Sequence, residues 1–443
     1  MTLARRTLLK SMLAGGFAAA GGSLGWLQRA HAMSDLAGAG DYRALVIVFL
    51  FGGNDASNML VPTGEDRYAR YRGIRTGLSL ARDSLLPLSG SDEGLHPSMP
   101  GLQSLHARGD LAVVRNVGSL ITPVSRTALE RGSVSLPAQL FSHSDQQDQT
   151  QRGTADLLDN HGWLGLAADA LESYNPPSAL SPNLSFAGTN ILQTGRRMVP
   201  YVADTEEIRG LVVFEDGGPS WTLHDQLLGR TRANALAAEH LRRKRDANDV
   251  FLELSRAFAN LSPMQTVFPA SPLGAQLEAV TRYLAVRDQF GFRRQTFFVG
   301  VGDYDTHDNQ LVQQALNLAQ LDTALTAFDA ALGELGLRDA VTTSTLSEFG
   351  RTLTINGDGT DHGWAGHNLV LGGAVRGGVY GAPTSFDLAG ADDTGEGNII
   401  PSISNDTHAA TLLRWFGLSE GEVQQVLPNL RNFDGQDVGF MNV

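Results

Sequence analysis

The sequence contains no cysteine among its 443 residues. Disulfide bonds are therefore excluded even in an oxidising compartment, and stability must come from a hydrophobic core. Positive charge is also scarce, because the formal net charge is -13. Nucleic acid binding requires a basic field, so this charge argues against nucleic acid as a partner. A basic cluster, Arg242 to Arg245, falls within a helical pattern and is interpreted as a solvated helix face.

Long hydrophobic runs are missing after the N-terminal region, and no later stretch reaches the roughly 20 residues that cross a bilayer. The N-terminal region has Arg5-Arg6, an apolar stretch over 11–26 and the small-x-small sequence Ala30-His31-Ala32. This pattern predicts a twin-arginine signal peptide over residues 1–32, with an uncleaved membrane anchor as the alternative. We expect export by the Tat translocase, cleavage after Ala32, and a periplasmic or extracellular protein without a stable membrane span.

The rest of the chain, residues 33–443, has no internal repeat and no long linker, which favours a single domain. Continuous apolar runs over 44–51, 111–117 and 293–302, and a further run after Val341, predict buried strands. Periodic apolar residues predict helices between them, over 98–107, 222–259, 271–291 and 311–337. This order predicts an α/β fold, a three-layer sandwich with a central, mostly parallel sheet flanked by helices.

Polar side chains follow the predicted strands, at the points where the strands end. Carboxyl ends of parallel strands meet at one edge of a sheet, so these groups can converge despite their distance in sequence. A glycine-rich loop, GDGTDHGWAGH, adds two histidines and is flexible enough to direct both inward. Carboxylates and imidazoles are suitable ligands for one or two divalent metal ions. The predicted ligands are Asp55, Asp305, His307, Glu348, His362 and His367. Alternatively, each residue is a helix cap, a turn former or a satisfied polar group, and no tight motif such as HExxH is present.

The segment FSHSDQQ contains Ser142, His143 and Ser144, which are candidates for the catalytic nucleophile and its base. A capped helix start is the alternative interpretation of this segment. Arg351 is a candidate for binding a tetrahedral oxyanion such as phosphate or sulfate. It could equally pair with Glu348.

Several motifs in order, LVIVFLFGGND, GLHPSM, LAVVRNVG, LFSHSDQQ, LSEFGRT and DGTDHGWAGHN, resemble an uncharacterised family of twin-arginine-exported bacterial proteins. That family, a domain of unknown function, is placed in the alkaline phosphatase/sulfatase-like superfamily. The resemblance implies a metal centre in which Asp55 matches the ligand after the first strand, and Asp305 with His307 resembles a later Asp/His pair. It implies that Ser142 to Ser144 occupy the nucleophile region. Glu348-Phe349 departs from this pattern, since the superfamily usually has Asp-His there.

The resemblance implies a metal-dependent hydrolase or transferase acting on a phosphate or sulfate ester, in a small molecule or a polymer. The alternative is a non-catalytic periplasmic binding or assembly protein that retains the fold.

Overall fold

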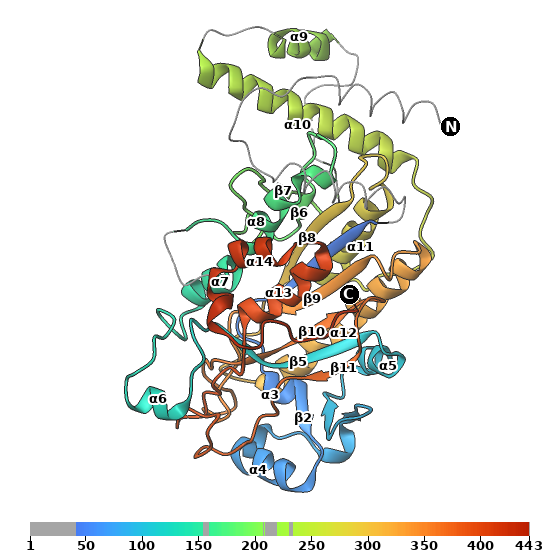
Figure 1. Ribbon diagram of the computed structural model, residues 1–443. Helices are drawn as coiled ribbons and strands as arrows, with labels where there is room; N and C mark the ends of the chain where they lie inside the picture. Colours follow the sequence, from blue (N-terminus) through green and yellow to red (C-terminus); the bar gives the residue numbers. More distant parts are fainter. Residues whose placement is uncertain (1–40, 154–158, 207, 209–218, 230–233, 443) are drawn as a thin grey trace, which may run out of the picture. The chain divides into compact units, whose positions relative to one another are not determined.

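Strand β1 (Arg43–Leu50) is the central strand of a nine-stranded sheet in the computed structural model (Figure 1). The structure describes residues 41–153, 159–206, 208, 219–229 and 234–442, and the predicted signal peptide lies outside them. Residues Tyr42–Val443 form one compact unit. No helix in the described part of the chain is both long and apolar enough to cross a membrane.

The sheet has the strand order β11-β5-β10-β9-β1-β8-β6-β7, and β12 pairs with β5. Strand β10 is antiparallel to both of its neighbours, and the other pairings are parallel. The remaining strands are β5 (Leu111–Gly118), β6 (Asn183–Ser185), β7 (Tyr201–Val202), β8 (Arg294–Val301), β9 (Val341–Leu346), β10 (Gly366–Leu371), β11 (Gly378–Tyr380) and β12 (Ile403–Ser404).

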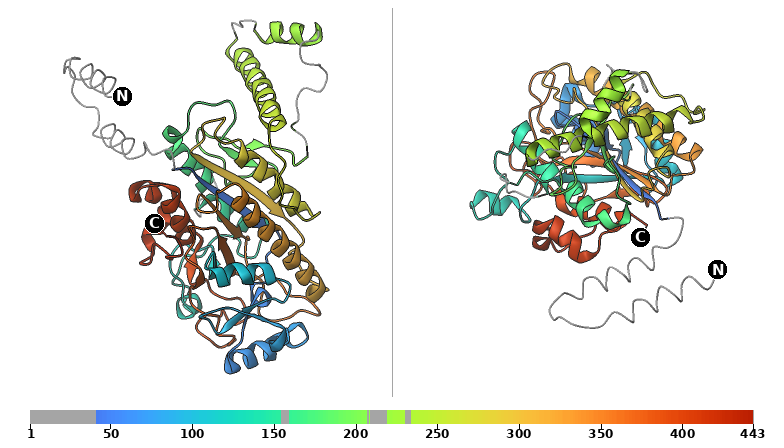
Figure 2. Two further views of the ribbon diagram at one scale, coloured as in Figure 1. Left: turned by 90° about the vertical axis from the view of Figure 1, so that its right-hand side faces the viewer. Right: turned by 90° about the horizontal axis from the view of Figure 1, so that it is seen from above.

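Helices cover both faces of this sheet, because the central strand β1 is apolar on both faces (Figure 2, left). Alternate residues of a strand face opposite sides. Val46 and Val48 pack in one hydrophobic cluster with helices α5 (Pro100–Arg108), α10 (Ala235–Ala259), α11 (Pro272–Ala285) and α12 (Gln310–Glu334). Leu45 and Ile47 pack in the other with α8 (Trp163–Ala170), α13 (Asn405–Phe416) and α14 (Glu420–Val426). The predicted three-layer α/β sandwich with a mostly parallel sheet is confirmed.

A small antiparallel sheet of β2 (Leu60–Pro62), β4 (Glu93–Leu95) and β3 (Leu86–Pro87) precedes α5 in the chain. The other helices are α3 (Ala56–Met59), α4 (Glu65–Arg75), α6 (Arg126–Glu130), α7 (His143–Arg152) and α9 (Pro219–Leu228). The sequence locates α5, β5, β8 and α12 to within a few residues. Two expectations were wrong: the helical run over 222–259 is two helices, α9 and α10, and His367 lies in strand β10 rather than in a loop.

Candidate metal centre

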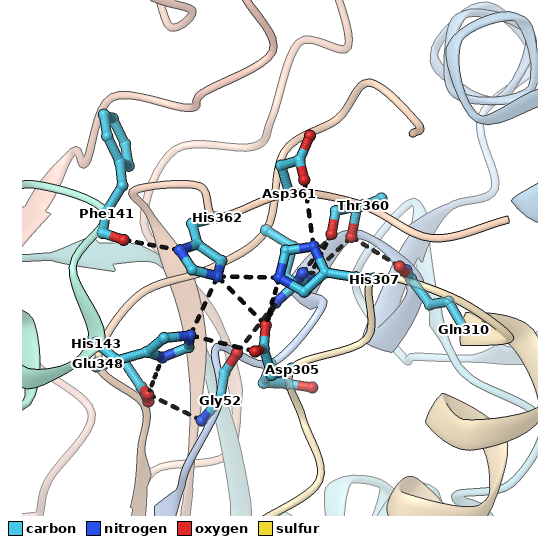
Figure 3. Close-up of polar contacts among 12 residues, drawn as sticks. Gly52, Phe141, His143, Asp305, His307, Gln310, Glu348, Thr360, Asp361 and His362 are labelled. Atoms are coloured by element: carbon cyan, nitrogen blue, oxygen red, sulfur yellow. Dashed lines mark hydrogen bonds and ion pairs between the residues drawn. The ribbon is translucent and has the colours of Figure 1, made fainter. Parts of the chain in front are cut away.

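The loops that follow β8 and β9 and the start of α7 meet at one edge of the central sheet (Figure 3). Strand β1 pairs with β8 up to Leu50–Val301 and with β9 up to Phe49–Leu346, so the three strands end at the same level. Asp305 and His307 follow β8, and His362 lies on the loop between β9 and β10. Helix α7 contributes its first residue, His143.

Three imidazole nitrogens and one carboxylate converge at this edge. The Nε2 atom of His362 lies 3.1 Å from Nε2 of His143 and 3.1 Å from Nε2 of His307. The Asp305 carboxylate lies 2.9 Å from Nε2 of His307, 3.3 Å from that of His362 and 3.4 Å from that of His143. His143, Asp305 and His362 each have a ligand atom within 4.8 Å of those of the other two, so these three residues could hold a metal ion. We call His143, Asp305, His307 and His362 the histidine cluster.

The opposite ring nitrogen of each histidine faces a separate acceptor. Nδ1 lies 2.9 Å from Oε1 of Glu348 in His143 and 3.2 Å from Oδ1 of Asp361 in His307. In His362 it lies 2.7 Å from the carbonyl oxygen of Phe141. These partners favour the tautomer that carries its proton on Nδ1, which leaves the Nε2 lone pairs directed at the centre of the cluster.

The charges within the cluster depend on burial and on two partners outside it. Burial would raise the pKa of Asp305, but the hydrogen bond and charge of Arg351 outweigh burial, and the pKa is lowered. The hydrogen bond to Glu348 raises the pKa of His143, whereas burial lowers the pKa of His362. The cluster therefore has an ionised carboxylate, Asp305, and an imidazole that is readily neutral, His362. This combination attracts a cation, whereas protonation of His143 would oppose cation binding.

One side of the cluster is open to solvent and the other is closed by an aromatic ring. The side chains of Asp305 and His307 are 43% and 44% exposed. Phe349 is buried, and its ring centroid lies 4.9 Å from the centroids of both His143 and His362. A ligand can therefore approach from the exposed side without movement of the core.

Close backbone contacts fix the loops that carry the cluster. Gly52, at φ +118°, lies so near the loop after β8 that an added Cβ would be 2.3 Å from the Asp305 nitrogen. A Cβ on Gly350 would lie 2.0 Å from the carbonyl oxygen of Ala365. Both positions require glycine, because any side chain would push these loops apart.

Three predicted metal ligands lie outside the cluster. Asp55 is fully buried and forms two hydrogen bonds of 2.8 Å with Arg75, so it faces that guanidinium. The Glu348 carboxylate faces Nδ1 of His143 and so orients that imidazole. His367 is buried in β10, where its Nδ1 accepts a hydrogen bond from the Asn116 backbone.

The predicted catalytic residues are also placed differently. Arg351 has a fully buried side chain, and each of its three nitrogens donates to an acceptor: Thr360, Gly52 or Asp305. The carboxylate that pairs with Arg351 is Asp305, and not Glu348 as the alternative interpretation expected. Ser142 directly precedes His143 in the sequence, and its hydroxyl donates to the Asp145 carboxylate at 2.6 Å. Sequence reasoning assigned His143 to catalysis and missed its place among the ligand atoms, because no spacing motif connects it to residues beyond 300.

Residues 42–396 match the family model described as Protein of unknown function (DUF1501). The chain belongs to this family. The DUF1501 match includes every residue of the histidine cluster and every strand of the central sheet except β12. The predicted membership in an uncharacterised family is thus confirmed, and twin-arginine export stays a prediction. A search of curated proteins finds no match to this DUF1501 protein.

Several solved structures are similar to the DUF1501 chain at low identity. Lipoteichoic acid synthase LtaP from Listeria monocytogenes is 9% identical, with 90% of this chain and 75% of that chain covered and a TM-score of 0.36. A phosphonate monoester hydrolase from Silicibacter pomeroyi is 12% identical, with coverages of 85% and 74% and a TM-score of 0.35. A sulfatase from Pseudoalteromonas sp. is 10% identical, with coverages of 89% and 71% and a TM-score of 0.34. TM-scores below 0.5 carry no argument about activity.

Proposed function

We propose that this protein is an exported, metal-dependent hydrolase or transferase that acts on a phosphate or sulfate ester. The observation that carries the proposal is the convergence of three Nε2 atoms and the Asp305 carboxylate, with every Nδ1 facing an acceptor. The twin-arginine pattern at the N-terminus supports export to the periplasm or beyond it.

The donor set fits a divalent transition metal. Ligand atoms about 2.0 to 2.1 Å from a tetrahedral ion lie roughly 3.3 Å from one another. The contacts among His143, Asp305 and His362, from 3.1 to 3.4 Å, are close to that spacing. Imidazole ligands suit zinc or iron, whereas magnesium and calcium prefer oxygen ligands. We therefore propose one ion, of the zinc type, held by His143, Asp305 and His362, with His307 beside Asp305 and His362 as a further donor.

Each neighbour of the cluster has a role in this proposal. The bound ion would supply a Lewis acid that neutralises the charge of a tetrahedral phosphate or sulfate group. Glu348, Asp361 and the Phe141 carbonyl hold the imidazoles in orientation. The exposed side of Asp305 and His307 admits the ester. Ser142 is the proposed nucleophile, because it precedes His143 and its hydroxyl donates to the Asp145 carboxylate, which can accept its proton.

A non-catalytic binding or assembly protein is the second candidate function. The full engagement of Arg351 favours it, because a guanidinium that is 0% exposed does not offer a donor to an incoming oxyanion. In that case the cluster binds a metal for structure or recognition, and substrate turnover is absent.

An ester screen distinguishes the two functions. The protein, purified from the periplasm of a Tat-competent host, is assayed with para-nitrophenyl phosphate, bis(para-nitrophenyl) phosphate and para-nitrophenyl sulfate. His362→Ala and Ser142→Ala test the cluster and the nucleophile, and Ser133→Ala is a control on an exposed loop. We expect turnover that both test variants lose and the control keeps. A wild-type protein that contains metal but turns over none of the esters would favour the binding protein. A wild-type protein without metal would contradict both the proposed zinc-type ion and the proposed metal-dependent reaction.

A further inference from the structure

A buried ion pair lies behind the histidine cluster, at the end of β1. Asp55 and Arg75 are both fully buried, and the guanidinium of Arg75 donates to both carboxylate oxygens at 2.8 Å. The Asp55 carboxylate also accepts a hydrogen bond from Nε2 of Gln310, the first residue of α12. The pair thus holds the point at which the loop after β8 enters its helix.

The same chain of hydrogen bonds continues to the cluster. The Oε1 atom of Gln310 accepts from the Thr360 hydroxyl at 2.7 Å, and that hydroxyl accepts from Nε of Arg351 at 2.9 Å. Arg351 then donates from Nη1 to Oδ1 of Asp305 at 2.8 Å. The complete chain, which we call the buried relay, is Arg75, Asp55, Gln310, Thr360, Arg351 and Asp305. Gln310 and Thr360 join it with their side chains and are fully buried (Figure 3).

The energetics make a purely structural role a poor explanation. Burying two charges costs free energy that a hydrophobic pair of similar size would not cost. The side chains of the relay are hydrogen-bonded in sequence, and the carbonyl oxygens of Thr360 and Gly52 also accept from Arg351. The relay connects the ends of β1, β8 and β9 to the one carboxylate among the four cluster residues. Outer hydrogen-bond partners of this kind orient a ligand and tune its affinity for metal.

We propose that the buried relay positions the Asp305 carboxylate for metal binding, with Gln310 and Thr360 as positioning residues and Asp55 as their anchor. This inference rests on the proposed function, because it requires the cluster to bind an ion. It gives Asp55 a role different from direct ligation: the residue acts on the Asp305 ligand through three intervening side chains, Gln310, Thr360 and Arg351, and sets its geometry.

The test breaks one link without changing volume. Thr360→Val removes the hydroxyl and keeps the shape, whereas Thr360→Ser keeps the hydroxyl and loses a methyl group. Glu93→Gln is the control for a buried ionic cluster outside the relay, since Glu93 pairs with Arg67 and Arg115. The measurements are the zinc dissociation constant by chelator competition, the visible absorption spectrum of the cobalt form, and the melting temperature.

We expect Thr360→Val to weaken zinc binding about 10- to 100-fold and to change the cobalt spectrum. Thr360→Ser and Glu93→Gln should bind zinc within about threefold of the wild type, whatever their melting temperatures. A folded Thr360→Val protein with the wild-type zinc affinity and cobalt spectrum would overturn the relay and leave the proposed function standing. A wild type that binds neither ion would overturn both.

Discussion

The Nε2 atoms of His143 and His362 lie 3.1 Å apart, although 219 residues separate the two histidines in the chain. The other nitrogen of each ring already faces an acceptor, Glu348 or the Phe141 carbonyl. With both protons on Nδ1, two lone pairs face each other, an arrangement that a bound cation or an added proton on His143 would relieve. This pair therefore supports the proposed metal centre more directly than the number of acidic groups around it.

Removal of the charge on Glu348 should weaken metal binding. Glu348 is buried and accepts hydrogen bonds from the Gly52 backbone, from Gln147 and from His143. Glu348→Gln keeps the shape but gives His143 a weaker acceptor, so we expect zinc affinity to fall about 10-fold or more. Isothermal titration calorimetry measures the change. An affinity equal to that of the wild type would mean that Glu348 does not orient the imidazole.

His367→Ala should lower stability and leave metal content unchanged. Burial lowers the pKa of His367, and its neutral ring accepts a hydrogen bond from the Asn116 backbone N–H. Loss of that acceptor leaves a buried donor unpaired, at a cost of about 1–3 kcal/mol before the added cost of a cavity. Thermal unfolding and elemental analysis of the same preparation check both parts. Loss of the metal from a folded variant would restore His367 as a ligand.

Gly52→Ala should disturb the metal centre through the backbone. The new Cβ would meet the Asp305 nitrogen at 2.3 Å, in a backbone conformation with φ +118°. We expect a loss of at least about 2 kcal/mol of stability, together with weaker zinc binding. Gly90→Ala is the matched control, because Gly90 also has a positive φ, +76°, and has open space around its Cβ position. If Gly52→Ala and Gly90→Ala changed stability and zinc binding equally, backbone strain alone would explain the effect, and the Asp305 loop would not be displaced.

The contribution of Asp406 to the stability of the protein should fall as the pH rises from about 4 to 8. Burial raises the pKa of this carboxyl from 3.8 to about 8, and its Oδ2 has no hydrogen-bond partner. Over this pH range the unfolded state releases the proton and the folded state keeps it. The stability that Asp406 contributes is therefore present below its unfolded pKa and lost as the pH rises through its folded pKa, at a limit of about 1.4 kcal/mol per pH unit.

Asp406→Asn should remove this slope, because the amide does not ionise. Urea unfolding at pH 4 and pH 8 should show a variant that is more stable than the wild type at pH 8 and similar to it at pH 4. Asp83→Asn, at an exposed position, is the control. A parallel pH dependence of wild type and Asp406→Asn would show that the buried carboxyl is ionised in the folded state.

The fold was largely predictable from the sequence, because its main signals are local. Strand β1 is a continuous apolar run, and helix α12 repeats apolar residues at helical spacing. The division into α9 and α10 was not predicted, because the residues of both helices favour helix and no proline separates them in the sequence.

The site was predictable as an edge of the sheet but not as a set of contacts. Strand ends indicated Asp305 and His307, and the glycine-rich loop indicated His362. The structure brings these three side chains together, and their role as metal ligands stays a prediction. Asp55 has the same sequence signal, yet Arg75, 20 residues later, occupies its carboxylate. Such pairing depends on how α4 packs and is not visible in the spacing of residues. His143 differs again, because a helix start far away in sequence brings it to the edge.

The most direct test of the metal centre is elemental mass spectrometry of natively purified protein, with His143→Ala and Ser144→Ala compared with the wild type. The two substitutions are at adjacent residues, the first two of the same helix, and Ser144 is exposed. We predict about one transition-metal ion per chain in the wild type and in Ser144→Ala, and a large loss in His143→Ala. Wild-type protein without metal, or a His143→Ala variant that retains it fully, would contradict the account.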